Sequence, residues 1–213
     1  MPKVKNRLAV KQNLEQLIEQ LQDSCQVDDD SPITNLEISQ QDARDIEALA
    51  SSLENLSSFP NPLTYASQLL DGAWLLEYST AREIRSLRNL PLGFSVGKIY
   101  QVIDAETASF ENKAWVKHKS GLLSGYVRVT ATFEPAVEKS AELSKRTINV
   151  DFQQRFVAIT KILGLKTKLL DPIKVVEAKN PPGRTPSLDI SYVDDTMRIG
   201  RGGDGSLFIL TRV

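Results

Sequence analysis

Two glycine-rich segments carry the residue types and spacing that could do chemistry. Gly93-Phe-Ser95-Val-Gly97 matches the G-x-S-x-G pattern of a serine nucleophile, and Gly200-Arg-Gly202-Gly-Asp-Gly205 matches the G-x-G-x-x-G pattern of a dinucleotide site. A serine nucleophile of this kind sits between a strand and a helix, and a dinucleotide site needs a helix directly after its glycines. The residues that follow each segment have the pattern of a strand instead. We therefore expect Ser95 to lie within a strand and the second segment to form a hairpin turn.

The composition excludes several classes of function. The 213 residues include 26 Lys and Arg against 27 Asp and Glu, a formal net charge of −1, which argues against binding nucleic acid by neutralising phosphates. Cys25 is the single cysteine and His118 the single histidine, so the chain lacks an internal disulfide and the residues of a multi-thiolate metal site. We expect a protein that is not an enzyme, with no catalytic set, no metal and no cofactor.

The N-terminal residues give no sign of a secretory signal or of a membrane span. They are basic, but no apolar stretch of the signal-peptide kind follows them, and no window approaches ~18 consecutive apolar residues. We expect the protein to work in a reducing, cytosolic or stroma-like compartment and to meet a membrane only at its surface.

The expected secondary structure, which must position any site, changes from helices to strands along the chain. Apolar residues recur with helical spacing in a segment from about Leu8 to Asp23 and in a second one that begins after Ser39. Ser39, followed by Asp42 three residues later, has the pattern of a helix N-cap. Pro60 and Pro62 stop the second helix. We expect residues 1–62 to form a helical extension.

Residues 63–213 are expected to form the main domain. After Leu69 the apolar pattern alternates with a period of two, and the segments are joined by short turns without helical patterns between them. This arrangement predicts eight or nine antiparallel strands in a mainly β, closed or nearly closed barrel. A barrel of about eight strands has room for its own side chains plus one small ligand.

The spacing Gly72-Ala-Trp74 on the first predicted strand is the more informative motif. In lipocalin-type barrels such a tryptophan closes one end, and an arginine from a late strand covers its ring. The candidates are Arg198, Arg201 and Arg212, and we favour Arg212 because it follows the last apolar run. The alternative is an ordinary core tryptophan.

Three stretches together resemble one family. They are Leu69–Thr80, Val96–Asp104 and the long segment Leu188–Arg212. They are similar to the opening strands and the C-terminal block of the plastid-lipid-associated proteins, also called plastoglobule fibrillins. Residues 136–146 and 163–170 match nothing in that family.

The resemblance implies a lipocalin-like barrel that binds or organises hydrophobic molecules in a photosynthetic organism. The implied ligands are prenylquinones, carotenoids, other isoprenoids or lipids, at thylakoid membranes or lipid bodies. The N-terminus is expected to be that of a cyanobacterial member or of a mature form in the plastid stroma or plastoglobule. Within the C-terminal block, Asp195, Arg198 and Gly202 match the family. We expect Asp195 or Asp194 to hold the start of a hairpin, Arg198 to pair with it and Gly202 to supply a positive φ.

Strand alternation predicts which side chains line the barrel and contact a ligand. We expect Tyr78 and Tyr192 to orient a ligand oxygen, and the alternative is that the inward side chains simply fill the barrel. The predicted lining consists of Trp74, Leu76, Tyr78, Val127, Val129, Phe133, Tyr192, Phe208 and Leu210.

Other partners stay open at this stage. Lys3, Lys5, Arg7 and Lys11 could touch an anionic lipid surface, although a solvated, disordered end is the simpler interpretation. An interaction protein that supports a prenyl synthase or photosystem assembly is one alternative function. An enzyme on a similar barrel, such as a bilin lyase, is another.

Overall fold

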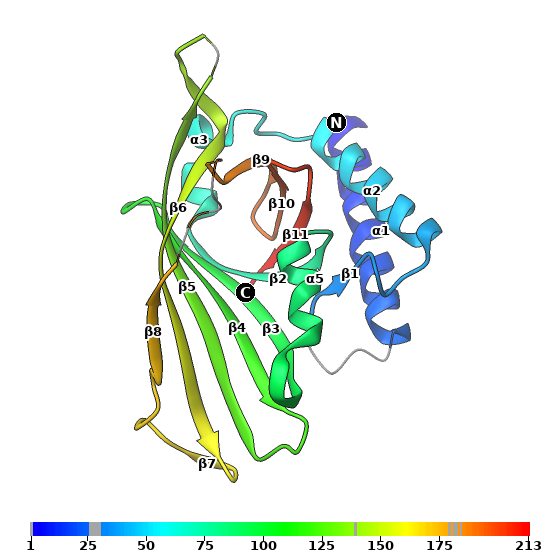
Figure 1. Ribbon diagram of the computed structural model, residues 1–213. Coiled ribbons are helices and arrows are strands. Elements are labelled where there is room, and N and C mark those ends of the chain that lie inside the picture. The colour runs from blue at the N-terminus through cyan, green and yellow to red at the C-terminus, as the bar shows by residue number, and fades with distance from the viewer. Residues whose placement is uncertain (1, 26–30, 139, 179, 181–182, 184) are drawn as a thin grey trace.

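The barrel is closed and antiparallel, as predicted, in the computed structural model, which describes residues 2–25, 31–138, 140–178, 180, 183 and 185–213 (Figure 1). Within these residues eight strands pair in the order β2-β11-β10-β9-β6-β5-β4-β3, and β3 pairs again with β2. The ring consists of β2 (Gly72–Ser79), β3 (Phe94–Asp104), β4 (Ser109–His118), β5 (Leu123–Val137), β6 (Leu143–Ile162), β9 (Ser187–Val193), β10 (Met197–Gly202) and β11 (Leu207–Arg212).

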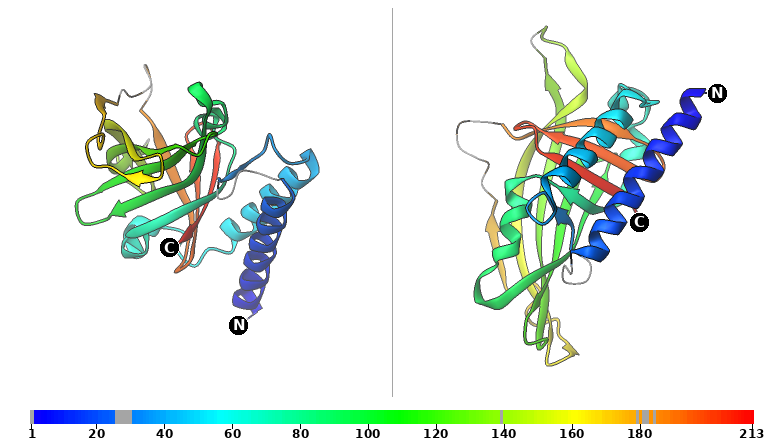
Figure 2. Two further views of the ribbon diagram at one scale, coloured as in Figure 1. Left: turned by 90° about the horizontal axis from the view of Figure 1, so that it is seen from below. Right: turned by 90° about the vertical axis from the view of Figure 1, so that its right-hand side faces the viewer.

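Two N-terminal helices cover one outer wall of this barrel. The structure has α1 at Pro2–Ser24 and α2 at Gln40–Asn55, and the Ser39 hydroxyl caps α2 by accepting from the Asp42 backbone N–H, as its sequence predicts. Figure 2 shows both helices lying along the face of β10 and β11. A short strand, β1 (Ile33–Thr34), follows α1 and pairs in parallel with β2.

Short helices occur in the segments before β2 and between β2 and β3. Before β2 lie α3 (Pro62–Tyr65) and α4 (Ser67–Leu70). Between β2 and β3 lie α5 (Arg82–Ser86) and the 3-10 turns η1 (Leu87–Asn89) and η2 (Pro91–Gly93). Ile84, Leu87 and Leu90 from this second connection pack against the barrel core.

The wall under the helices separates two apolar cores. The inner cluster fills the barrel and includes Trp74, Leu76 and Leu210, while the outer cluster joins Leu14 and Ile46 of the helices to the opposite face of the same strands. The strands of this wall are therefore apolar on both faces, except for β10, whose inner face carries Arg198. The outer cluster consists of Leu14, Ile18, Ile33, Ile46, Ala50, Leu53, Tyr78, Tyr192, Met197, Ile199, Leu207 and Ile209.

A bulge in β2 moves Tyr78 out of the barrel. Ile209 pairs with Tyr78 and Leu210 pairs with Leu76, so Glu77 is the extra residue on β2. One extra residue reverses the alternation for every later side chain on the strand. The prediction that Tyr78 lines the interior is therefore wrong.

A similar bulge occurs in β9. Ile199 pairs with Tyr192 and Gly200 pairs with Ile190, which leaves Ser191 as the extra residue. Ile190 belongs to the inner cluster, whereas Tyr192 lies in the outer cluster beneath the helices. The prediction that Tyr192 lines the interior is wrong for the same reason.

Four strands extend beyond the closed part of the barrel. β3, β4, β5 and β6 have 11, 10, 15 and 20 residues, whereas β2, β9, β10 and β11 have 8, 7, 6 and 6. Figure 1 shows the long strands running past the others toward the end that carries β7 (Leu165–Lys166). A further short strand, β8 (Lys174–Glu177), pairs with β6. We call the part of the barrel made by β3–β6 alone the open half.

Candidate ligand site in the barrel interior

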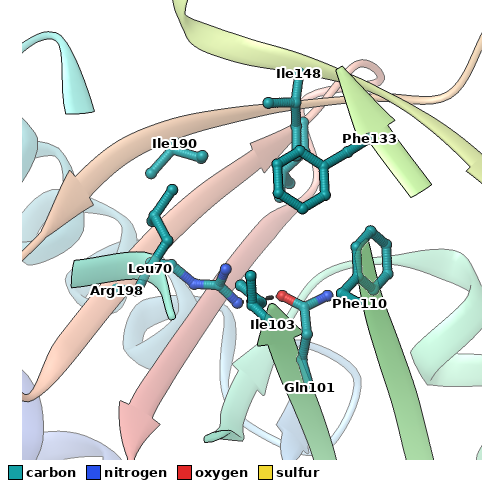
Figure 3. Close-up of a pocket in the computed structure, with 9 residues that line it drawn as sticks. Leu70, Gln101, Ile103, Phe110, Phe133, Ile148, Ile190 and Arg198 are labelled. Atoms are coloured by element: carbon teal, nitrogen blue, oxygen red, sulfur yellow. Dashed lines mark hydrogen bonds between the residues drawn. The ribbon is translucent and has the colours of Figure 1, made fainter. Parts of the chain in front are cut away.

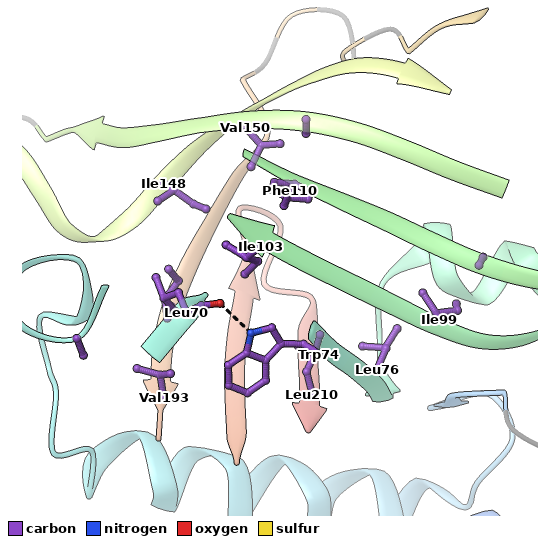
Figure 4. Close-up of a cluster of buried hydrophobic side chains, with 14 of the residues drawn as sticks. Leu70, Trp74, Leu76, Ile99, Ile103, Phe110, Ile148, Val150, Val193 and Leu210 are labelled. Atoms are coloured by element: carbon purple, nitrogen blue, oxygen red, sulfur yellow. Dashed lines mark hydrogen bonds between the residues drawn. The ribbon is translucent and has the colours of Figure 1, made fainter. Parts of the chain in front are cut away.

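Trp74 closes one end of the interior. Its side chain is fully buried, and its indole Nε1 donates a hydrogen bond of 2.8 Å to the Leu70 carbonyl (Figure 4). The buried ring thus has its polar atom satisfied, as a tryptophan in a core requires.

Arg212 covers this tryptophan, in the arrangement that the sequence favours. Its guanidinium carbon lies 4.4 Å from the centre of the Trp74 ring. The same guanidinium donates to the backbone carbonyls of Asp195 and Asp71, at 2.9 and 2.7 Å, and to that of Leu69. Arg212 therefore ties three chain segments to the closed end.

Gly72 leaves the space that Arg212 occupies. Its φ is +103°, and a Cβ added there would lie 3.0 Å from Nη1 of Arg212. The glycine of the Gly72–Trp74 motif thus serves both a backbone conformation and a close contact.

Arg198 is the second arginine near Trp74, and it points into the barrel. It is 3% exposed, its guanidinium carbon lies 5.2 Å from the Trp74 ring centre, and it donates to the side-chain oxygen of Gln101 (Figure 3). Among the residues that the structure describes, no carboxylate forms an ion pair with it. Burial, together with the nearby charge of Arg212, lowers the pKa of Arg198 to about 9.

The start of the hairpin between β9 and β10 is held by Asp194, one of the two aspartates predicted for this role, but the predicted pairing with Arg198 is wrong. Asp194, rather than Asp195, accepts the backbone N–H bonds of Thr196 and Met197, at 2.9 and 2.8 Å. Arg198 does not pair with either aspartate, because residue 198 lies on the inner face of β10 and its guanidinium reaches Gln101.

The glycines of the last hairpin also differ from the prediction. Gly205 has the positive φ, 85°, and Gly202 is not among the residues with a positive φ. A Cβ on Gly202 would lie 2.9 Å from Oδ1 of Asp204, so any larger residue there would displace the carboxylate that accepts from Ser206. As expected, Gly200–Gly205 belongs to the β10–β11 hairpin and holds no nucleotide-binding helix.

The closed half of the barrel is filled by side chains. The cavity beside Arg198 has a volume of about 10 Å³, roughly the room for one water molecule. This matches the alternative in which inward side chains fill the barrel. The cavity is lined by Leu70, Gln101, Ile103, Phe110, Phe133, Ile148, Leu188, Ile190 and Arg198.

The predicted lining residues occupy three different places. Trp74, Leu76 and Leu210 belong to the filled inner cluster, and Phe133 and Phe208 pack against it. Val127 and Val129 lie on the same inner face of β5 as Phe133 but in the open half, where they are only partly buried. Tyr78 and Tyr192 lie outside the barrel under the helices.

The two tyrosine hydroxyls face the helical layer. The Tyr192 hydroxyl donates 2.6 Å to Oδ2 of Asp194, which also accepts from Lys11 Nζ at 2.7 Å. Burial raises the pKa of Tyr78 to about 12, and burial together with the bond to Asp194 raises the pKa of Tyr192. Neither hydroxyl is placed to orient a ligand in the barrel.

This network also changes the role expected for the N-terminal cations. Lys11 is buried against Asp194 and Thr196, and Arg7 donates to Ser58, so these two are bound to the protein itself. Both belong to α1, which begins at Pro2, whereas the sequence favoured a disordered end.

A polar pair on the inner face escaped the sequence analysis. Gln101 accepts from Arg198, and its Nε2 donates 2.9 Å to Oδ1 of Asn112 on the neighbouring strand. Gln101 stands between Ile99 and Ile103, both of which belong to the inner cluster. A lone amide in an inward row of isoleucines was the available signal.

The hydrolase motif assembles no site. Ser95 lies in β3, and its hydroxyl donates to the Lys117 carbonyl at 3.2 Å. His118 contacts Ser120 rather than Ser95.

Within the described part of the chain, no group of three or more His, Cys, Asp or Glu side chains is placed to hold a metal ion. No helix in that part has the length and apolar character needed to cross a membrane.

The sequence was compared with known protein families and with individual known proteins. Residues 15–211 match the family model PAP_fibrillin. The chain is 30% identical to "Chromoplast-specific carotenoid-associated protein, chromoplastic" of Cucumis sativus over 83% of this chain and 62% of the relative. It is 31% identical to "Plastid-lipid-associated protein 6, chloroplastic" of Arabidopsis thaliana over 76% of this chain and 58% of that relative.

A third relative shows the same coverage as the Cucumis sativus protein. It is "Light-induced protein, chloroplastic" of Solanum tuberosum, which is 28% identical over 83% of this chain and 62% of its own length. The chain thus spans less than two thirds of the length of these relatives. No solved structure matches it.

Proposed function

Because this chain belongs to the PAP/fibrillin family, we propose that it binds and organises hydrophobic small molecules in a photosynthetic cell, without catalysing their conversion. The ligand class is an isoprenoid, a prenylquinone, a carotenoid or another lipid. The setting is the surface of a thylakoid membrane or lipid body, in a cyanobacterium or a plastid. The names of two relatives, which refer to carotenoid and to plastid lipid, support this class.

The buried guanidinium of Arg198 is the observation that carries the proposal. A charged group removed from water without an acidic partner is costly, and charged groups whose pKa is strongly shifted by burial cluster at functional sites. Arg198, Gln101 and Asn112 form a polar track that runs along the inner face toward the open half. This track suits the carbonyl or hydroxyl oxygen of a quinone or xanthophyll.

The open half supplies the apolar surface. Val127 and Val129 lie on its inner face and are partly exposed, whereas Trp74, Leu76 and Leu210 of the inner cluster are buried. Burying several hundred Å² of an isoprenoid chain there would contribute several kcal/mol at ~25 cal/mol per Å². The ligand would lie with its chain along these valines and its oxygen toward Asn112 and Gln101.

A matched pair of variants on β5 tests this placement. Val129→Asp puts a charge on the inner face, whereas Thr130→Asp puts the same charge one residue along, on the outer face. Titration of the delipidated protein with decyl-plastoquinone, followed by quenching of tryptophan fluorescence, should show a Kd at least about tenfold weaker for Val129→Asp only. Equal Kd values for the two variants, or no saturable quenching in the wild type, would refute it.

The filled closed half favours one second candidate. A barrel without a ligand would act as an interaction protein through its outer surface, in support of a prenyl synthase or photosystem assembly. Wild-type protein that gives no saturable quenching yet stays folded and monodisperse would favour this alternative.

A further inference from the structure

Five exposed leucines gather at the end of the barrel where the long strands turn. Leu92 is 85% exposed, Leu122 50%, Leu163 68%, Leu165 75% and Leu169 93%. Soluble proteins rarely expose large contiguous apolar patches unless they bind something there. We call these five residues the leucine tip.

Hydrogen bonds between three turns hold this tip together. The Leu163 N–H donates 2.7 Å to the Leu122 carbonyl, which joins the β6–β7 turn to the β4–β5 turn. The Lys119 N–H donates 2.9 Å to the Gly93 carbonyl, which joins the β4–β5 turn to η2. Figure 1 shows these turns at the end of the molecule that carries β7. Leu92, Leu122 and Leu163 therefore lie in or next to turns that are joined at this end, and Leu165 and Leu169 follow Leu163 in the chain.

Two of these leucines occupy backbone conformations that disfavour leucine. Leu92 has φ 62° and Leu163 has φ 51°, and each directly precedes a glycine with positive φ. In the left-handed region the Cβ of an L-residue crowds its own backbone, so asparagine or glycine is the usual choice at such exposed turns. Since their side chains are exposed, contacts within the chain do not explain why leucine stands there.

The tip is also positively charged in a chain with no excess of cations. Residues 152–170 contain Arg155, Lys161, Lys166 and Lys168 but no acidic residue. The three lysines, Lys161, Lys166 and Lys168, are exposed, and so is Lys119 in the β4–β5 turn. Exposed leucines with exposed lysines in the same turns and strand ends complement a layer with an apolar interior and anionic head groups.

We propose that the leucine tip inserts into the head-group layer of an anionic lipid surface. The lysines contact the acidic head groups, and the leucines enter the boundary with the acyl chains. The open half of the barrel lies at this same end, so an apolar molecule could pass between the lipid and the inner face of β5 without crossing water. That last step alone rests on the proposed function; insertion of the tip does not.

Vesicle binding by the full chain tests the insertion. The wild type should co-sediment with vesicles of phosphatidylglycerol and phosphatidylcholine, much less with phosphatidylcholine alone, and less as salt rises. Leu165→Ser and the double variant Lys166→Glu/Lys168→Glu should each lower the partition coefficient at least about tenfold. Leu143→Ser is the matched control, because Leu143 is 62% exposed but lies in the hairpin at the other end of β6.

Leu163→Asn separates lipid binding from folding. Asparagine tolerates the positive φ of residue 163, so this variant should unfold at the same or a higher denaturant concentration while it binds vesicles more weakly. Vesicle binding that is absent in the wild type, or equal in the wild type and all tip variants, would overturn the proposal. So would a wild-type dimer that Leu165→Ser dissociates, because a second copy would then cover the tip. None of these outcomes affects the quinone titration, which is done without lipid.

Discussion

The guanidinium carbon of Arg212 lies 4.4 Å from the centre of the Trp74 ring. The pair joins the last strand of the barrel to the first, and three backbone carbonyls hold the arginine in place. Arg198 approaches the same ring at 5.2 Å, but it is buried and its hydrogen bond goes to Gln101. We therefore expect the two arginines near this indole to affect the free energy of folding in opposite ways. Arg212 should stabilise the fold, whereas the buried charge of Arg198 should destabilise it.

Replacing Arg212 should destabilise the barrel. Arg212→Met removes the cation over Trp74 and leaves the carbonyls of Leu69, Asp71 and Asp195 without this donor, so we expect a loss of about 2–3 kcal/mol in the free energy of unfolding. Urea denaturation followed by tryptophan fluorescence measures it. Arg82→Met, at an exposed position of α5, is the control and should change stability by less than about 0.5 kcal/mol. A loss of the same size in both variants would contradict the role given to Arg212.

Replacing Arg198 should have the reverse effect on stability. Arg198→Met removes a buried charge that has no acidic partner, and a methionine fills similar space, so we expect no loss and up to about 2 kcal/mol of gain. The same variant should bind decyl-plastoquinone more weakly, because it removes one end of the polar track. A destabilisation of about 3 kcal/mol would show that Arg198 is structural.

The Asp194 carboxylate should make stability depend on pH. Burial alone would raise its pKa, but the bonds from Lys11, Tyr192 and the backbone N–H groups of Thr196 and Met197 outweigh burial and hold the pKa below 3.8. Because the folded pKa is lowered, this stabilisation is complete above the unfolded pKa and is lost as the pH falls through the folded pKa.

Asp194→Asn tests this linkage. We expect the variant to lose about 2–4 kcal/mol at neutral pH, and the difference from the wild type to shrink below about pH 4. Asp195→Asn serves as the control, since its side chain is exposed and its neighbour takes the backbone bonds. A difference that is constant between neutral pH and pH ~3 would rule out the charge as its cause.

The helical layer should contribute strongly to the stability of the barrel. Ile46 of α2 is fully buried in the outer cluster, so Ile46→Ala should cost about 2–4 kcal/mol. Ile173→Ala makes the same truncation at a residue that is 52% exposed and should have little effect. If Ile46→Ala were equally silent, the helices would be an independent attachment rather than part of the core.

Much of this architecture follows from the sequence because its causes are local. Alternation after Leu69, the Ser39 cap and the Gly72–Trp74 spacing predict the barrel, the start of α2 and the covering arginine. Tyr78 and Tyr192 were misplaced because single extra residues, Glu77 and Ser191, reverse the alternation, and a bulge depends on how two strands pair.

The candidate site is less predictable for a related reason. Arg198 and Gln101 are 97 positions apart, and β10 and β3 are brought together only when the barrel closes. The leucine tip likewise joins turns that only the tertiary fold makes neighbours, which is why residues 163–170 had no role in the sequence analysis.

The most direct test of the proposed function is mass spectrometry of an organic extract of the protein purified from a photosynthetic host. We predict an isoprenoid or quinone at a stoichiometric ratio in the wild type and in Thr130→Asp, and its loss in Val129→Asp. An empty extract from wild-type protein that is folded and monodisperse would contradict ligand binding, and would leave the outer surface as the functional part of the barrel.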